Sequence, residues 1–268
     1  MKRSVLVICV AFLAAGAVQA AEFNTNPNPL NPASGTLYLP EDPNITQNSD
    51  TSTVTELLGV ACGAGGISAE NYFLRRFFLN ADHSIALQYN VTSVDLGIES
   101  VNVYVGTGAP ISANLYSIAN GAAFTFANMT QIGTNTRDFP DGTALVVENF
   151  PVTGAILDPM GEDLVVAMYF PDTVDAYGIW PGANSNGQTQ PCYLAAVDCG
   201  VAEPTAFGDI GFGDVHWIAV VNGDEQVVPT PTAGPTGGEP VPALSSYGIV
   251  AMVLLMVGVA VLVMWRRS

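Results

Sequence analysis

Hydrophobic and polar residues alternate over short segments through the middle of the chain, and Gly, Pro, Asn and Asp residues separate one segment from the next. Every second residue from Ile85 to Val91 is hydrophobic, which is the period of a half-buried β-strand. Similar segments predict strands at residues 101–105, 113–118, 124–132, 145–150, 163–170, 178–180 and 216–221. Helical periodicity nowhere exceeds two turns in this region, so the pattern predicts an all-β domain built as a β-sandwich.

The strongest of these segments, residues 72–79, carries bulky residues at odd and even positions and is therefore expected to be a central strand. Successive side chains of a strand point to opposite faces of its sheet, so Arg75 and Arg76 must do the same. We expect one of them to lie half-buried against a carboxylate. For the whole domain we expect a single jelly-roll-like β-sandwich, with an immunoglobulin-like sandwich as the second choice.

The N-terminus has the pattern of a secretory signal peptide. Lys2 and Arg3 form a basic start, residues 5–17 are apolar, and the small residues at 18–20 form a cleavage site. We expect residues 1–20 to form a signal helix that directs the chain through the Sec translocon and is removed by signal peptidase. Cleavage one residue later fits the sequence as well.

The C-terminus predicts a membrane segment. Residues 249–265 are 17 apolar residues without charge or proline, which just reaches the length of a helix that spans a bilayer. Arg266 and Arg267 follow at once and form a basic tail with residue 268, so the positive-inside rule keeps this end in the cytoplasm. Everything before the helix is then expected to be exported.

The eight residues before this helix resemble an IPTL-type C-terminal sorting signal, a relative of PEP-CTERM. They are Val241, Pro242, Ala243, Leu244, Ser245, Ser246, Tyr247 and Gly248, with alanine where the pattern has threonine and tyrosine where it has tryptophan. In that family an exosortase-family transpeptidase recognises the proline-centred motif, the short helix and the basic tail together. The resemblance implies that residues 241–268 are processed, whereas hydropathy alone predicts a plain membrane anchor.

The charge of the exported part is strongly negative. All 24 acidic residues lie between Glu22 and Glu239, where only three residues are basic, so this part carries −21 against −17 for the whole chain. Nucleic acids and anionic lipid surfaces need a basic patch and are excluded as partners. The charge favours solubility outside the cell and affinity for divalent cations. About 200 residues of this hydrophobicity are expected to bury one core and form one domain.

Composition divides the exported part into three segments. Residues 21–56 are rich in Asn, Pro, Ser and Thr and are interpreted as a loosely packed leader. Residues 57–223 hold the predicted strands and form the sandwich domain. Residues 224–240 have the Pro, Thr and Gly pattern of an extended, flexible linker.

The sandwich segment resembles the exported, jelly-roll-like choice-of-anchor domains of bacteria. The resemblance rests on the runs at residues 156–159, 163–166, 181–189 and 213–217. Domains of this kind are joined to interchangeable C-terminal anchors and sorting tags and have no settled activity. The resemblance therefore implies a location on the outside of the cell more than a function.

Three cysteines remain once Cys9 leaves with the signal peptide, which allows one disulfide and one free thiol. Cys62 precedes the first strong strand and Cys199 precedes the last, and the first and last strands of a sandwich are often neighbours. We favour a Cys62–Cys199 bridge with Cys192 free, and a local Cys192–Cys199 bridge is the alternative. The spacing does not match a zinc site.

No catalytic motif is present around either histidine of the domain, His83 or His216, and we expect the two to lie apart without a triad. Two acidic turns are candidate calcium sites, since calcium accepts carboxylate and carbonyl oxygens. Acidic turns in an acidic protein are the simpler interpretation. The carboxylates of these turns belong to Asp138, Asp141, Asp209 and Asp214.

One aromatic residue is a candidate ligand contact. Trp180 opens a loop with the amide side chains of Asn184, Asn186 and Gln188, and an exposed tryptophan beside amides is able to bind a sugar ring. A tryptophan in the core is the more common alternative.

Two hypotheses follow for the function. The first is a non-enzymatic protein of the cell surface or extracellular matrix, tethered to the inner membrane and then processed through its C-terminal sorting signal. The second is a carbohydrate-binding module on the same anchor, with an extracellular polysaccharide as partner. Neither needs a cofactor, apart from the candidate calcium.

Overall fold

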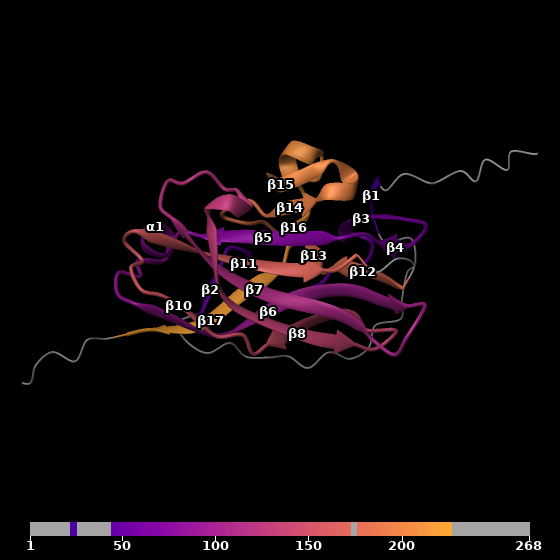
Figure 1. The fold of residues 1–268 in the computed structure, drawn as a ribbon, viewed down its shortest axis with the longest axis horizontal. Coiled ribbons are helices and arrows are strands. Elements are labelled where there is room, and N and C mark those ends of the chain that lie inside the picture. Colours follow the sequence, from indigo (N-terminus) through magenta and orange to yellow (C-terminus); the bar gives the residue numbers. More distant parts are fainter. Residues whose placement is uncertain (1–21, 26–43, 173–175, 227–268) are drawn as a thin grey trace, which may run out of the picture. The chain divides into compact units, whose positions relative to one another are not determined.

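The computed structural model describes residues 22–25, 44–172 and 176–226. Most of this part consists of two six-stranded antiparallel sheets in a sandwich-like arrangement (Figure 1). The first, called the β6 sheet, contains β10 (Gly154–Ile156), β6 (Tyr89–Val103), β17 (Ala219–Glu225), β2 (Ile45–Thr46), β9 (Ala144–Phe150) and β12 (Tyr177–Pro181). The second, called the β11 sheet, has the order β15 (Val201–Ala206), β14 (Tyr193–Ala196), β5 (Asn71–Phe77), β11 (Glu162–Phe170), β7 (Ala109–Ala119) and β8 (Met129–Phe139). The all-β prediction is thereby confirmed.

The remaining elements are short. A three-stranded sheet and a two-stranded sheet are formed by β1 (Glu22–Thr25), β3 (Val60–Ala64) and β4 (Ile67–Ser68), and by β13 (Ala183–Asn184) and β16 (His216–Trp217). The helical turns are α1 (Leu79–His83), η1 (Phe126–Asn128), η2 (Val197–Cys199) and η3 (Phe207–Ile210). Among the described residues no helix is both long and apolar enough to cross a membrane.

Strand β6 organises its sheet because it is long enough to pair with four others. It pairs with β10 and β9 and also with β17 and β12. The predicted strands at 85–91 and 101–105 are therefore one strand that starts at Tyr89. A side chain at Gly97 would collide with the main chain of Gly182, so glycine lets β6 continue past this close contact.

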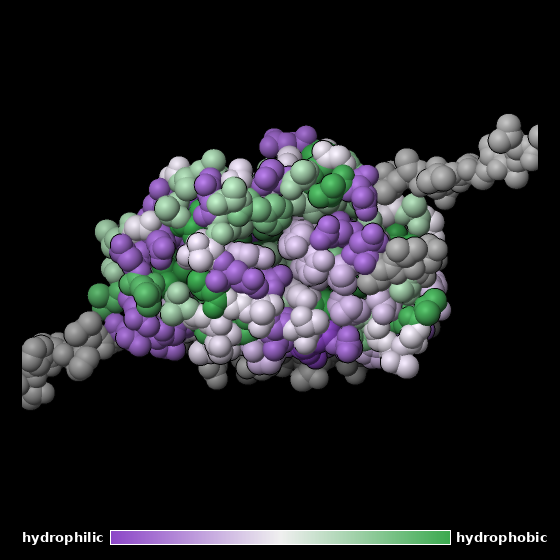
Figure 2. Space-filling model, in the orientation of Figure 1, coloured by the Kyte–Doolittle hydropathy of each residue, from purple (hydrophilic) through white to green (hydrophobic). Residues whose placement is uncertain are grey.

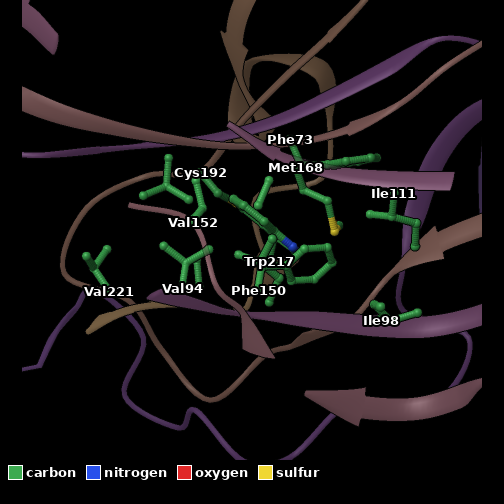
Figure 3. Packing of buried hydrophobic residues seen from close by; sticks show 14 of the residues in the cluster. Phe73, Val94, Ile98, Ile111, Phe150, Val152, Met168, Cys192, Trp217 and Val221 are labelled. Atoms are coloured by element: carbon green, nitrogen blue, oxygen red, sulfur yellow. The ribbon is translucent and has the colours of Figure 1, made fainter. Parts of the chain in front are cut away.

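The main core lies between the two sheets, where inward-pointing residues of both interdigitate. Figure 3 shows the Trp217 indole among side chains of both sheets, with Phe73 and Met168 from the β11 sheet and Val94 and Phe150 from the β6 sheet. All five side chains are fully buried. In β5, β6 and β11 successive residues are buried, so these central strands are covered on both faces and do not show the half-buried alternation that the period-2 pattern predicts.

The favoured disulfide is confirmed. Cys62 in β3 is bonded to Cys199 in η2, 137 residues away, with their Cα atoms 6.0 Å apart. Cys192 is free and buried. Because the bridge closes a long loop in the unfolded chain, a native disulfide of this kind contributes about 2–5 kcal/mol to stability. It also indicates an oxidising compartment outside the cytosol.

Two predicted boundaries are wrong. The leader was predicted at 21–56, but β1 pairs with β3, β2 pairs with β17, and Gln47 donates a hydrogen bond of 2.7 Å to the Arg76 carbonyl. Residues 22–25 and 44–56 therefore belong to the folded part, and residues 26–43 lie outside the described residues. The strand predicted at 124–132 begins at Met129 instead, and the aromatic residues before it cover the outer face of the β11 sheet. In both cases tertiary contacts override a local composition signal.

The chain divides into two units, residues 1–226 and 227–268. The second unit lies outside the described residues, and so does the predicted signal peptide at 1–20. The predicted linker lies outside them from residue 227 on.

Candidate functional site

The most deeply buried charge of the described chain is Arg75, which β5 points between the two sheets with 0% of its surface exposed. Its Nε donates a hydrogen bond of 2.9 Å to the Trp217 carbonyl, and a terminal nitrogen donates to the same oxygen. The other acceptors are Gln188 Oε1 at 3.1 Å, the Gln190 carbonyl at 3.3 Å and Gln47 Oε1 at 3.5 Å. These acceptors are neutral, and no ion pair of Arg75 occurs among the described residues.

The groups around Arg75 stabilise the fold and do not form a reactive site. Burial lowers the pKa of Arg75 to about 10, which leaves the guanidinium charged at neutral pH. Burial raises the pKa of the nearby Cys192 thiol, although the charge on Arg75 acts in the opposite direction. The Cys192 thiol donates to the Val215 carbonyl at 3.2 Å. A protonated, buried thiol is a poor nucleophile, so the cluster joins distant segments of the chain and offers no reactive group.

The two histidines contact different elements. His216 in β16 accepts a hydrogen bond of 3.1 Å from the Gly187 N–H through Nδ1, which requires a neutral ring. Burial lowers its pKa, and the charge on Arg75 lowers it further. His83 at the end of α1 lies 6.1 Å from Phe77 between ring centroids, and burial lowers its pKa too.

The structure corrects the predicted sugar contact at Trp180. Only 1% of this residue is exposed, because β12 places it in the main core beside the end of β6. Gly178 and Gly59 lie against its side chain. An indole enclosed in this way has no face for a ligand, so the interpretation as an exposed stacking residue is wrong and the core alternative holds.

The amide side chains of the following loop bind the protein itself. Asn184 is fully buried and donates hydrogen bonds of 2.9 and 3.1 Å to the carbonyls of Asp50 and Thr53. Asn186 donates to the Asp50 carboxylate at 2.9 Å, and Gln188 accepts from Arg75. These contacts attach residues 44–56 to the sandwich and do not form an exposed ligand platform.

The acidic turns show no metal centre. Within the described ranges no group of three or more His, Cys, Asp or Glu side chains is placed to hold a metal ion. Asp141 accepts a hydrogen bond of 2.9 Å from the Val103 N–H and so supports a turn, while Asp138 lies opposite Pro110 at the end of β8. Asp209 lies in η3 and Asp214 is exposed in the loop before β16. The calcium hypothesis gains no support.

A feature that the sequence analysis missed is the outer face of the β11 sheet. Two adjacent rows of outward residues cross β5, β11, β7 and β8, and we call them the tyrosine–threonine face. The register places these residues side by side: Tyr72, Tyr169, Ser112 and Thr136 in one row, and Leu74, Ala167, Asn114 and Thr134 in the next. Their neighbours along each strand, such as Phe73 and Met168, point into the main core.

The hydroxyl groups of this face are held in pairs. Ser112 Oγ and Thr136 Oγ1 lie 2.7 Å apart, and Thr134 donates to Asn114 Oδ1 at 2.7 Å. Thr134 and Thr136 are exposed, whereas Ser112 is half-buried. Each hydroxyl can donate one hydrogen bond and accept others, so these pairs retain capacity for a ligand at the surface.

Aromatic rings border the hydroxyl pairs. The Tyr72 and Tyr169 rings lie 4.5 Å apart between centroids, and Phe126 from the β7–β8 connection meets Tyr72 edge-on at 5.1 Å. The Tyr169 hydroxyl donates to Glu70 Oε1 at 3.1 Å. Burial raises the pKa of both tyrosines, so both phenols are neutral in the physiological range. The sequence signal for this face is the alternation of Ser112, Asn114 and Tyr116 with apolar residues, but its register with β11 is a tertiary property.

The surface around these rows is mixed in character. Figure 2 shows hydrophilic and hydrophobic residues interspersed over the face of the molecule turned to the viewer. Arg76 and Asp163 form a buried ion pair of 2.7 Å at one end of the β11 sheet's outer face. The aromatic ring of Phe124 lies 5.9 Å from the Arg76 guanidinium carbon.

Comparisons with known proteins identify no family for this chain. No family model matches the sequence, and no curated protein matches it. Among solved structures, the chain is similar to the cysteine protease and lectin-like domains of Cwp84, a surface layer associated protein of Clostridium difficile. The identity is 8% and the TM-score 0.36, with 62% of this chain and 38% of that chain covered. The chain thus spans well under half of that structure, and a similarity of this level carries no argument about function.

Proposed function

We propose that this chain is a non-enzymatic, exported display protein: a jelly-roll-like sandwich carried to the cell envelope, tethered by residues 249–265 and then processed through the sorting signal at 241–248. The observation that supports export most directly is the Cys62–Cys199 disulfide. The basic and apolar pattern at both ends of the sequence agrees with it.

The site chemistry supports a non-catalytic role. The buried polar cluster around Arg75 uses its groups on one another, and its one thiol is enclosed and protonated. Hydrolysis or acyl transfer needs a nucleophile and a base that meet in an accessible cleft. The negative charge of the exported part suits a protein that has to stay soluble outside the cell.

Intact-mass analysis of the envelope fraction tests the sorting step. We expect the mature protein to lack the C-terminal helix, and Pro242→Ala to leave the full-length chain in the membrane. Leu254→Val, a conservative change inside the apolar run, serves as control and should be processed normally. Mature protein that still ends with Arg266 and Arg267 would contradict processing and leave the plain membrane anchor.

A further inference from the structure

We propose that the tyrosine–threonine face binds a neutral oligosaccharide or polysaccharide. The proposal goes beyond display at the cell surface and uses a different surface from the Trp180 loop, which the fold encloses. It rests on three properties of the face: its lack of charge, its paired hydroxyls and its half-buried tyrosine rings.

The charge of the face selects the class of ligand. Leu74, Ala167 and Asn114 are buried, and the five residues of the face that solvent reaches are uncharged in a chain with a formal charge of −17: Tyr72, Tyr169, Ser112, Thr134 and Thr136. The charges that border the face are the carboxylates of Glu70, Asp138, Asp172 and Glu203 and the already neutralised Arg76–Asp163 pair. An anionic ligand would meet net repulsion from these carboxylates, and a cation would be attracted to the bordering carboxylates and not to the hydroxyls of the face. A neutral ligand is neither repelled by these carboxylates nor attracted away from the hydroxyls of the face.

The hydroxyl pairs of the face indicate that the ligand carries hydroxyl groups of its own. The Ser112–Thr136 pair uses one of its two hydroxyl hydrogens internally and keeps the other as a donor, while Thr134 donates its hydrogen to Asn114 and keeps its oxygen as an acceptor. Sugar hydroxyls also need a donor and an acceptor each. The exposed side chains here, Thr134 and Thr136, are polar, whereas the centre of a protein–protein interface is apolar and dry. A polyhydroxylated ligand therefore fits better than a protein partner.

The tyrosine rings supply the apolar part of the contact. Tyr169 and Tyr72 lie next to Ser112 and Thr136 in the same row of the sheet, so ring and hydroxyls face the same side. Phe126, whose N–H donates to Glu203 Oε2 at 2.9 Å, supports the Tyr72 ring from the side. Aromatic rings bind the C–H-bearing face of a sugar, and a ring that its neighbours already hold loses little entropy on binding.

Binding by the full chain tests the proposal. The chain is expressed without a sorting enzyme and purified in a detergent that has no sugar headgroup. The probes are immobilised neutral glycans (β-1,4-glucan, β-1,3-glucan, xylan, mannan and galactan) and acidic ones (polygalacturonate and hyaluronate). We expect at least one neutral glycan to bind and the acidic ones not to bind at 0.15 M salt. The readout does not depend on sorting, so it fails or succeeds independently of the display function.

Variants locate the site. Tyr169→Ala should weaken binding about tenfold through loss of the ring, whereas Tyr169→Phe should keep most of it. Thr136→Val removes one exposed hydroxyl at nearly constant shape and should weaken binding several-fold without affecting the fold. Tyr104→Ala, which removes another exposed tyrosine outside the face, is the control and should bind like the unchanged chain.

Three results would overturn the proposal. One is the absence of binding to every neutral glycan of the panel. Another is equal binding of acidic and neutral glycans, which the charge of the face does not allow. The third is glycan binding that Tyr169→Ala and Thr136→Val leave unchanged, because the site would then lie elsewhere. Self-association that Thr136→Val abolishes, with no glycan bound, would assign the face to a second copy of the chain instead.

Discussion

Two neighbouring arginines of β5 solve the problem of a buried charge in different ways. Arg75 points between the sheets and donates to neutral oxygens of Trp217, Gln188, Gln190 and Gln47. Arg76 points to the outer face of the β11 sheet, where it forms an ion pair of 2.7 Å with Asp163. The prediction that they lie on opposite faces, one against a carboxylate, is confirmed.

The difference reflects what each position has to join. The guanidinium of Arg75 binds three separate stretches of chain, around residues 47, 188–190 and 217, which are far apart in sequence. Arg76 also donates to the carbonyls of Ala122 and Ala119, at 2.8 and 3.1 Å, and holds the β7–β8 connection. Five donors in a rigid fork suit both tasks. The first arginine organises the core, and the second attaches a loop.

Replacing Arg75 should have the largest effect. Arg75→Met leaves the Trp217 carbonyl and Gln47 Oε1 buried without their donor, at a cost of about 1–3 kcal/mol each, and also removes the donor of the half-buried Gln188. We expect the free energy of unfolding to fall by about 3–5 kcal/mol, measured by denaturant titration. Arg137→Met removes a half-exposed ion pair with Glu148 and a hydrogen bond to the Asn149 carbonyl, and should cost less than Arg75→Met, about 1–2 kcal/mol. Equal losses in the two variants would contradict the role of Arg75.

Replacing Arg76 should cost less, and the cost should depend on pH. Arg76→Met leaves Asp163 buried without its partner, at a cost of about 3 kcal/mol at pH 7. Burial already raises the pKa of Asp163, although Arg76 opposes this, so without Arg76 the folded pKa rises further. A folded pKa above the unfolded value means that protonation favours the folded state as the pH falls. The loss should therefore shrink between pH 7 and pH 5.

The same titration distinguishes the two arginines. Arg75→Met leaves no carboxylate without a partner. Apart from the contribution of the histidines, the loss in free energy of unfolding should therefore be similar at pH 7 and pH 5. The double change Arg76→Met with Asp163→Asn should cost less at pH 7 than Arg76→Met alone, since no buried charge remains. A pH-independent loss for Arg76→Met would show that Asp163 does not carry an unpaired charge in that variant.

The smallest expected effect is on the His216 titration. Burial and then Arg75 lower the folded pKa of His216, so the unfolded chain takes up the proton first as the pH falls through about 6.5. Stability should decrease by a fraction of a kcal/mol between pH 7 and pH 5. In Arg75→Met the His216 pKa, measured by NMR, should rise. The His83 pKa is lowered by burial without a contribution from Arg75 and should stay unchanged.

Several features of the fold could be predicted from the sequence because they depend on short-range periodicity. Alternation along β5 predicts the opposite directions of Arg75 and Arg76, and alternating segments predict an all-β sandwich. The Cys62–Cys199 bridge was predicted correctly, but not for the stated reason, because β5 and β17 lie in different sheets; Cys199 comes close to Cys62 because η2 follows β14, which pairs with β5. The signals at the two ends of the chain are also local patterns, and they stay predictions.

The candidate sites could not be predicted from the sequence, because they depend on contacts between residues far apart in the chain. Trp180 is in the core because β12 pairs with β6, and the loop amides are used on residues 50–53.

The tyrosine–threonine face likewise exists only after Tyr72, Tyr169, Ser112 and Thr136, from four strands spread over about a hundred residues, come into register. The alternation of each strand determines which residues share a face. Which residues stand opposite one another is decided by packing of the whole sheet, because a shift of one residue in any strand would turn its core residues outward.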